Sequence, residues 1–245
     1  VYPLYILRNT YSRIIIAPRG MLQRGSLAIK SKKKHIYLSI IKRYFLSNHI
    51  IWHVTTPQEA DDLHKVIANA NTVLLGNIPS FDQKFIPRSL GMPGTKKVIG
   101  TIALISPMKN IHMALESLLT IEFPVEYRLY GPIKDSGYWE KCLQIIKRMP
   151  IAVQVNAPGE VMPTQTGLII SEFHFYLQPS VSENFGHSIF EALSHGVPVI
   201  ISDQTPWKNL YQQQAGWDVN LSDPEALSNA IREALSMDDA TYHLF

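Results

Sequence analysis

The stretch Gln178–Asp203, with the sequence QPSVSENFGHSIFEALSHGVPVIISD, constrains the fold of this chain more than any other segment. It begins as a polar loop, continues with apolar residues at helical spacing, and ends in the continuous apolar run at residues 197–201. A short apolar run of this kind is typical of a parallel strand that is covered on both faces. The stretch therefore predicts a strand end, a ligand loop, a short helix and a buried strand, as in an open α/β sheet.

The loop and the start of the predicted helix have the chemistry of an anion site. Gly186 allows the backbone to approach a ligand, and the N–H groups of Gly186, His187 and Ser188 are expected to be unpaired where the helix begins. A helix N-terminus attracts phosphate through such donors and through its dipole. Glu183 lies in the loop before it, and Glu191 lies about 7.5 Å beyond Gly186 along the helix axis. This arrangement suits a nucleotide sugar, whereas the alternative is that both glutamates are ordinary helix charges.

The spacing of these residues resembles the donor-site signature of glycosyltransferase family 4. Seven residues separate Glu183 from Glu191, Pro179-Ser180 precedes the pair, and GVPVI follows it at residues 196–200. Members of that family are retaining, nucleotide-sugar-dependent enzymes of the GT-B fold. The resemblance implies that Glu183 acts in catalysis through the sugar hydroxyls and that Glu191 contacts the ribose. It also implies donor contacts at Asn184, Phe185, Gly186, His187 and Ser188.

A lysine in a second loop is a candidate partner for the donor diphosphate. Lys109 lies between a predicted strand end and a predicted helix start, where an ammonium group can reach a diphosphate. The resemblance gives Lys109 a catalytic role, the neutralisation of that diphosphate. Family members usually have an arginine five residues before this lysine, whereas this chain has Leu104. Three alternatives follow: the helix that begins at Gly186 and Lys109 suffice for the diphosphate, another basic residue substitutes for the arginine, or donor turnover is weakened.

Two more loops resemble parts of the same cleft. Gly159-Glu160-Val161 resembles the loop that meets the nucleotide base, and the alternative is an ordinary turn. Arg19 and Gly20, in the run PRGML, resemble a cleft-facing loop on the acceptor side. An arginine that binds loop carbonyls would fit the sequence of that loop equally well.

Outside these loops, strand and helix patterns alternate along the chain, as in a doubly wound parallel sheet. Strands are expected at residues 12–17, 49–55, 72–75, 98–104, 127–130, 153–156, 174–177 and 197–201. Helices are expected at residues 30–45, 110–120, 137–149, 164–172 and 223–235. A further helix is expected from Thr56, where Thr56-Pro57-Gln58-Glu59 has the form of a capping box with Glu59 reaching back.

The expected fold class is α/β of the GT-B type, with two Rossmann-like domains. Residues 81–96 are rich in proline and glycine and are the predicted linker. Residues 97–245 would form the C-terminal, donor-binding domain, and residues 1–80 an N-terminal, acceptor-side domain that is too short to be whole. The chain starts at Val1 and its first methionine is Met21, so an incomplete sequence is expected. This chain alone is not expected to form a whole cleft.

Composition limits the compartment and the partners. The single cysteine, Cys142, excludes a disulfide framework within the chain and fits a reducing compartment. No apolar run reaches the roughly 18 residues of a membrane span, and no signal-peptide pattern opens the chain, so a cytoplasmic protein is expected. The basic amphipathic segment from Lys30 to Phe45 is either a solvated helix on the sheet or a peripheral contact with the inner face of a membrane. Nucleic-acid binding is not expected, because the net charge is only +3 and no recognised motif is present.

The sequence predicts no cofactor and no metal. His187 and Glu191 are four residues apart on the predicted helix, but no third ligand is apparent, and the resemblance implies no catalytic metal. Neither GxGxxG nor a P-loop is present. The hypothesis is a hexosyltransferase that moves a sugar, with retention, from a nucleotide-diphosphate sugar to a glycan or lipid-linked acceptor in cell-surface polysaccharide synthesis. The alternatives are a non-catalytic nucleotide-sugar-binding module, or incomplete fragment, and a sugar-nucleotide epimerase, which fits the glutamate pair less well.

Overall fold

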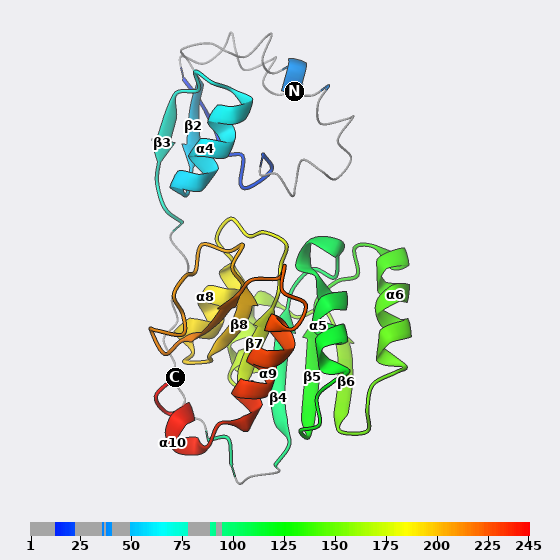
Figure 1. The fold of residues 1–245 in the computed structure, drawn as a ribbon. Coiled ribbons are helices and arrows are strands. Elements are labelled where there is room, and N and C mark those ends of the chain that lie inside the picture. The colour runs from blue at the N-terminus through cyan, green and yellow to red at the C-terminus, as the bar shows by residue number, and fades with distance from the viewer. Residues whose placement is uncertain (1–12, 23–35, 37, 41–49, 78–88, 92–94) are drawn as a thin grey trace. The chain divides into compact units, whose positions relative to one another are not determined.

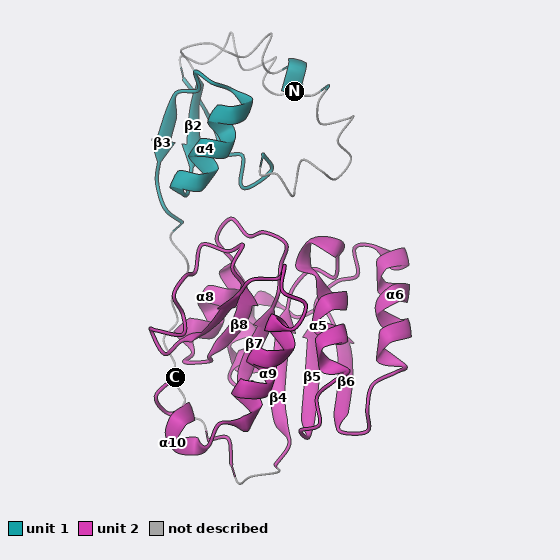
Figure 2. Cartoon of the chain, viewed as in Figure 1, with its two compact units in different colours: residues 1–78 teal, residues 79–245 magenta. Residues whose placement is uncertain are grey.

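The structure is a computed structural model, and it describes residues 13–22, 36, 38–40, 50–77, 89–91 and 95–245. The chain divides into two compact units, unit 1 at Val1–Ile78 and unit 2 at Pro79–Phe245 (Figure 2). The candidate donor loops all belong to unit 2, and the Arg19–Gly20 loop belongs to unit 1.

Unit 2 contains a six-stranded parallel sheet with the order β6-β5-β4-β7-β8-β9 (Figure 1). Its strands are β4 (Lys97–Ile102), β5 (Val125–Tyr130), β6 (Val153–Gly159), β7 (Phe175–Gln178), β8 (Val199–Ser202) and β9 (Gly216–Val219). In the order of the chain this is 3-2-1-4-5-6, so the direction of winding reverses between β4 and β7. The predicted doubly wound parallel sheet is confirmed for this unit. The sequence analysis missed β9, because its four residues GWDV begin with glycine and include an aspartate.

Helices cover both faces of the sheet. The helices of unit 2 are α5 (Ile111–Leu118), α6 (Ser136–Ile146), α7 (Thr166–Ile170), α8 (His187–Ser194), α9 (Ala226–Ser236) and α10 (Asp239–Tyr242). α5, α6 and α9 pack on one face, and α7 and α8 pack on the other (Figure 1). Right-handed crossovers produce this division, because successive strands step one way across the sheet before β6 and the other way after it.

Alternate residues of β7 belong to different cores. Phe175 and Leu177 join the core under α5 and α9, and Tyr176 joins the core under α7 and α8. All three side chains are fully buried. Since side chains alternate along a strand, Gln178 at the end of β7 shares the face of Tyr176 and α8. The expected helix at residues 164–172 is instead the 3-10 turn η2 (Pro163–Gln165) followed by the short α7.

The start of β9 requires glycine. Gly216 has a φ of +138°, and a Cβ at this position would lie 1.9 Å from the carbonyl oxygen of Val199. Gly216 pairs with Val199 in the parallel ladder between β8 and β9. Any larger residue at position 216 would therefore force two backbones apart.

Unit 1 contains a three-stranded parallel sheet with the order β1-β2-β3. Its elements are β1 (Ile14–Ile16), β2 (Ile50–Val54), α4 (Pro57–Val66) and β3 (Thr72–Leu74). Thr56 caps α4 as predicted, since its hydroxyl accepts the N–H of Glu59 at 3.1 Å. The predicted return of the Glu59 side chain to Thr56 is wrong, because that carboxylate binds other donors. The predicted helix at residues 30–45 lies largely outside the described residues.

Candidate functional site

Two loops meet at the carboxyl edge of the unit 2 sheet, where the winding reverses. The 3-10 turn η1 (Pro107–Lys109) follows β4, and the polar loop that leads to α8 follows β7. The N–H of Val181 in the second loop donates to the carbonyl of Met108 in the first at 2.9 Å. Ligands bind at such reversal points in open α/β sheets, because the loops on either side diverge there.

Glu183 and Lys109 form an ion pair at this point. Glu183 Oε1 accepts hydrogen bonds from Lys109 Nζ at 2.5 Å, from Ser180 Oγ at 2.7 Å and from Gln178 Nε2 at 2.8 Å. The side chain of Glu183 is only 11% exposed. None of the described residues hydrogen-bonds to its other oxygen, Oε2. The carboxylate is thus held by three donors on one oxygen, and Oε2 retains its full capacity to accept from a ligand.

Gly186 shapes the start of α8. Its φ is +77°, and a Cβ there would lie 2.8 Å from Cδ1 of Ile189. Gly186 is the N-cap and supplies no side-chain cap, and within the described chain no group accepts the amides of His187 and Ser188. The hydroxyl of Ser188 donates to Gln178 Oε1 at 2.9 Å. Gln178 therefore connects the first turn of α8 to the Glu183–Lys109 pair.

Glu191 lies partly buried on α8, three residues beyond Ser188. Burial raises the pKa of the Glu191 carboxyl above its usual value, and the nearby His187 and His195 oppose this shift. The Glu191 carbonyl accepts a hydrogen bond from Nδ1 of His195 at 2.8 Å. Its carboxylate has no hydrogen-bond partner among the residues that the structure describes. A hydroxyl group of a ligand would satisfy this carboxylate.

An aromatic cluster packs behind the loop, and sequence reasoning missed most of it. The ring of Phe185 lies 5.9 Å from that of Phe190 and 5.6 Å from that of Trp207. The indole N–H of Trp207 donates to the Phe185 carbonyl at 2.7 Å. Trp207 follows β8 by five residues. Its position after the carboxyl end of a predicted strand was therefore the one sequence signal that could have placed it near the site. The cluster fixes the backbone between Glu183 and α8.

The loop after β6 lies at the same edge of the sheet, on the far side of β5. The predicted strand at residues 153–156 is longer in the structure, because β6 continues to Gly159. Gly159 has a φ of +101°, and its carbonyl accepts the N–H of Gly131 at 2.8 Å. Glu160 is exposed and Val161 is partly buried beyond the strand end. Leu104 stands in the loop after β4, partly buried, and supplies no charge there.

In unit 1, hydrogen bonds join the Arg19–Gly20 loop after β1 to residues that follow the other two strands of the sheet. Both residues have positive φ, at 49° and 76°. Arg19 Nη1 donates to Oδ1 of Asn77, which follows β3, at 2.6 Å. The carboxylate of Glu59, 1% exposed, accepts the N–H of Gly20 at 2.7 Å and the N–H and hydroxyl of Thr55 at 2.8 Å each. Sequence reasoning missed Asn77 and this role of Glu59.

Replacing Glu59 with leucine is expected to loosen the Arg19–Gly20 loop. The change removes the carboxylate that accepts the N–H groups of Gly20 and Thr55, and a buried group that loses its partner costs about 1–3 kcal/mol. Hydrogen exchange at the Gly20 amide should accelerate by at least about tenfold, since local opening sets this rate. Asp61→Asn, at an exposed position of the same helix, is the control and should leave exchange unchanged. Equal exchange in both variants would contradict this role of Glu59.

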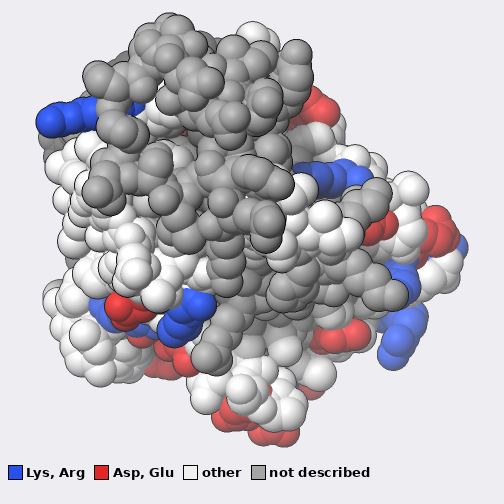
Figure 3. Space-filling view, turned by 90° about the horizontal axis from the view of Figure 1, so that it is seen from above, with Lys and Arg blue, Asp and Glu red and all other residues white. Residues whose placement is uncertain are grey.

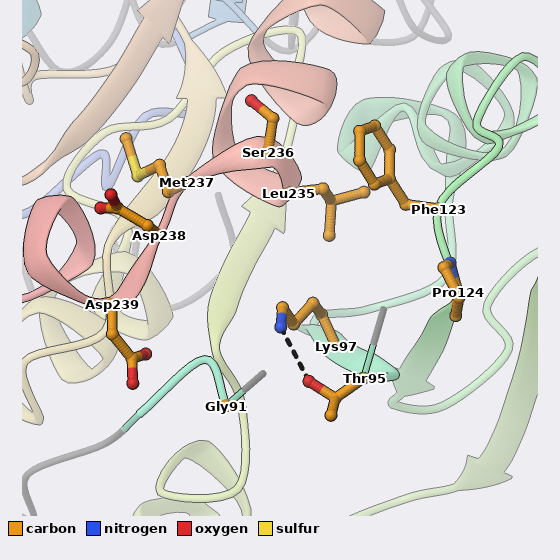
Figure 4. A pocket seen from close by; sticks show the side chains of 10 residues that line it. All are labelled: Gly91, Thr95, Lys97, Phe123, Pro124, Leu235, Ser236, Met237, Asp238 and Asp239. Atoms are coloured by element: carbon orange, nitrogen blue, oxygen red, sulfur yellow. Dashed lines mark hydrogen bonds between the residues drawn. The ribbon is translucent and has the colours of Figure 1, made fainter. Parts of the chain in front are cut away.

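A cavity of about 350 Å³ lies at the opposite, amino edge of the unit 2 sheet (Figure 4). Its lining residues are Gly91, Thr95, Lys97, Phe123, Pro124, Leu235, Ser236, Met237, Asp238 and Asp239. Lys97 Nζ donates to the Leu90 carbonyl and to Thr95 Oγ1. Burial lowers the pKa of Lys97, and the charge of Asp239 opposes this shift. Because Lys97 begins β4 and Lys109 follows the end of that strand, the cavity is separate from the Glu183 site.

Basic and acidic side chains are interspersed over the described part of the face in Figure 3. No helix in the described part of the chain is long and apolar enough to cross a membrane. Among the same residues, no group of three or more His, Cys, Asp and Glu is placed to hold a metal ion.

Unit 2 is thus a doubly wound α/β domain, and Lys109 and Glu183 lie where its winding reverses. The sequence profile of a family described as "Glycosyl transferases group 1" matches residues 82–243, which is most of the chain. This chain belongs to that family.

Individual relatives agree with this assignment. D-inositol 3-phosphate glycosyltransferase of Corynebacterium urealyticum is 25% identical over 219 residues, which cover 82% of this chain and 52% of that protein. O-antigen chain mannosyltransferase B of Escherichia coli is 30% identical over 153 residues, which cover 61% of this chain and 39% of that protein. The chain thus spans about half the length, or less, of these curated relatives.

The fold is also found in solved structures. The Anabaena protein HepE, in complex with UDP and glucose, matches with a TM-score of 0.75 at 15% identity, over 99% of this chain and 66% of HepE. At this level of identity the match concerns the fold alone. The predicted α/β fold of the GT-B type is confirmed.

Proposed function

We propose that this chain carries the donor site of a retaining glycosyltransferase of family 4. The enzyme would move a hexose from a nucleotide-diphosphate sugar to a glycan or lipid-linked acceptor. The observation that carries the proposal is the 2.5 Å contact between Lys109 and Glu183, linked through Gln178 to the first turn of α8. A cation, a carboxylate and unpaired helix amides at one point suit a diphosphate joined to a hydroxyl-bearing sugar.

Lys109 and the amides of His187 and Ser188 would hold the diphosphate. Negative charge develops on the diphosphate oxygen as its bond to the sugar breaks, and fixed donors lower the energy of that state. Lys109 is paired with Glu183 in the structure, so a bound diphosphate would compete for the same ammonium. Before the donor arrives, the ion pair with Glu183 would keep the lysine oriented.

The two glutamates would bind hydroxyl groups on either side of the diphosphate, one on the sugar and one on the ribose. Glu183 offers Oε2, which the described residues leave without a partner, to the sugar. Glu191 would accept from the ribose, and burial of its carboxyl strengthens such a hydrogen bond. The backbone at Gly159-Glu160-Val161 would meet the base, with Asn184 and Phe185 completing the loop. No metal is needed in this scheme.

Unit 1 would supply contacts to the acceptor. Arg19, held against Asn77, and the backbone at Gly20 are the candidate contacts. The name of the E. coli relative refers to the O-antigen chain, which supports a cell-surface polysaccharide intermediate as acceptor. A peripheral contact with the inner face of the membrane through residues 30–45, in a cytoplasmic enzyme, would give access to a lipid-linked acceptor.

A second candidate function is a non-catalytic nucleotide-sugar-binding module. Leu104 favours it, because an arginine at that position would have supplied a second cation for the diphosphate. Binding would then depend on Lys109 and the α8 amides alone.

Titration calorimetry with UDP-glucose, UDP-N-acetylglucosamine, GDP-mannose, UDP and GDP tests the proposal on the 245-residue chain. We expect one nucleotide sugar to bind more tightly than its free diphosphate, because Glu183 adds contacts to the sugar. Absence of binding by all five compounds would overturn both candidate functions. Binding without transfer by the full-length protein would favour the binding module.

A further inference from the structure

Gln178 lies between the two parts of the site that contact different portions of the donor. It is the last residue of β7 and is fully buried. Its amide nitrogen donates to Glu183 Oε1 at 2.8 Å, and its oxygen lies 2.9 Å from Ser188 Oγ and 2.6 Å from the Tyr176 hydroxyl. We propose that Gln178 is a positioning residue that fixes the sugar-binding carboxylate of Glu183 relative to the diphosphate-binding turn of α8. This role rests on the proposed function.

The hydrogen bonds determine which way the Gln178 amide points. In the opposite orientation the amide oxygen would face Glu183 Oε1, and two acceptors would repel each other. In the observed orientation the NH₂ group faces the carboxylate, and the oxygen accepts from two hydroxyl groups. Every strong polar group around this amide is therefore satisfied in one arrangement only.

Tyr176 holds the Gln178 amide by a hydrogen bond from the protein core. Its side chain is fully buried in the core under α8, and its hydroxyl oxygen, whose proton goes to Gln178, accepts the N–H of Ile102 at the end of β4 at 3.3 Å. The hydroxyl of Tyr176 thus bridges β4 and β7 directly beneath the site. Because β4 leads into η1 and Lys109, this bridge relates the lysine to Gln178 through two neighbouring strands of the sheet.

Gln178 becomes more important when the donor binds. Lys109 is one of three donors to Glu183 Oε1, and the diphosphate would draw it away. Gln178 and Ser180 then remain to hold the carboxylate, and of these two only Gln178 also contacts α8. The Glu183 carboxylate would therefore keep its orientation toward the sugar hydroxyls after Lys109 has moved to the diphosphate. Preorganisation of this kind increases the affinity for the sugar rather than for the nucleotide.

The test compares two variants with a matched control. Gln178→Leu keeps the size of the side chain and removes all three of its hydrogen bonds. Tyr176→Phe removes one hydroxyl beneath it. Tyr127→Phe is the control, since Tyr127 is also a fully buried tyrosine of the sheet whose hydroxyl bonds to a protein group, Thr101 Oγ1, at 2.9 Å.

Each protein is titrated with UDP, GDP, UDP-glucose, UDP-N-acetylglucosamine and GDP-mannose, and the measured quantity is the ratio of affinities for a nucleotide sugar and its free diphosphate. Gln178→Leu should reduce this ratio by roughly tenfold, as for loss of a hydrogen bond to a charged group, and leave diphosphate affinity within about twofold. Tyr176→Phe should reduce it by about threefold, as for a neutral hydrogen bond, and Tyr127→Phe should not change it.

The outcomes separate this role from the proposed function. If the unmutated chain binds a nucleotide sugar and Gln178→Leu and Tyr176→Phe both keep its full preference for the sugar, Gln178 is not a positioning residue. An equal loss in Tyr176→Phe and Tyr127→Phe would show a general effect of weakening the sheet and would also overturn the role. If the unmutated chain binds none of the five compounds, the proposed function fails, and this role fails with it.

Discussion

Replacing Glu183 with glutamine is expected to abolish sugar transfer almost completely while the fold of unit 2 is preserved. Glutamine has the same size and can still accept from Ser180, but it loses the charge that pairs with Lys109 and the second equivalent oxygen, which under the proposed function would accept from the sugar. Loss of one preorganised polar group at a reacting centre typically reduces turnover by about 10²–10³-fold. The release of nucleoside diphosphate from the donor, measured in the full-length protein, is the assay.

The control for this variant is Glu140→Gln. Glu140 is exposed on α6 and accepts a hydrogen bond from Gln144 of the same helix at 3.1 Å, so the same chemical change there should leave turnover unaltered. Thermal melting followed by circular dichroism should show folded protein in both variants. Full turnover in Glu183→Gln, together with a normal melting curve, would exclude Glu183 from catalysis.

Replacing Gly216 with alanine is expected to destabilise unit 2 severely. The new Cβ would lie 1.9 Å from the Val199 carbonyl oxygen, and the residue would also have to keep a φ of +138°. The added Cβ and the Val199 carbonyl oxygen are both fixed to the backbone and cannot turn away from each other. The strands β8 and β9 must therefore separate. We expect a loss of more than about 4 kcal/mol in the free energy of unfolding, which is exceptional for a single substitution.

Gly137→Ala is the matched control for this second variant. Gly137 lies in the first turn of α6, its φ is not in the left-handed region, and the nearest atom to an added Cβ is 3.6 Å away. Alanine should therefore stabilise the helix by about 0.5–1 kcal/mol. Urea denaturation measures both variants. Similar unfolding midpoints for the two alanine variants would contradict the close approach of β9 to β8.

Sequence patterns predicted the elements whose periodicity is long and clean. The loop, helix and strand of Gln178–Asp203 appear in the expected order, as α8 and β8, because an amphipathic helix and a buried apolar run are both local signals. β9 was missed because four mixed residues carry no period. β6 was predicted to end at residue 156, whereas in the structure it continues through Ala157, Pro158 and Gly159.

The contacts of the candidate site were less accessible to sequence reasoning. The resemblance marked Glu183 and Lys109 separately, but their contact joins residues 74 apart in the chain. Gln178 had no signal, since a single glutamine after an apolar strand is as consistent with an exposed end as with a buried bridge. Trp207 and Asn77 likewise depend on which loops the sheet brings together. Such contacts are set by the order of the strands, which a local pattern does not determine.

The pairing of β4 with β7 also determines when the site can exist during folding. Thr101 and the Leu177 carbonyl, which are hydrogen-bonded across this pairing, are 76 residues apart, whereas β4 pairs with β5 after a single crossover helix. Closing the longer loop costs more chain entropy. This cost is offset only when both hydrophobic cores form. A nascent chain that has folded β4, β5 and β6 would hold Lys109 without its carboxylate. The lysine meets Glu183 only after the two halves of the sheet have joined.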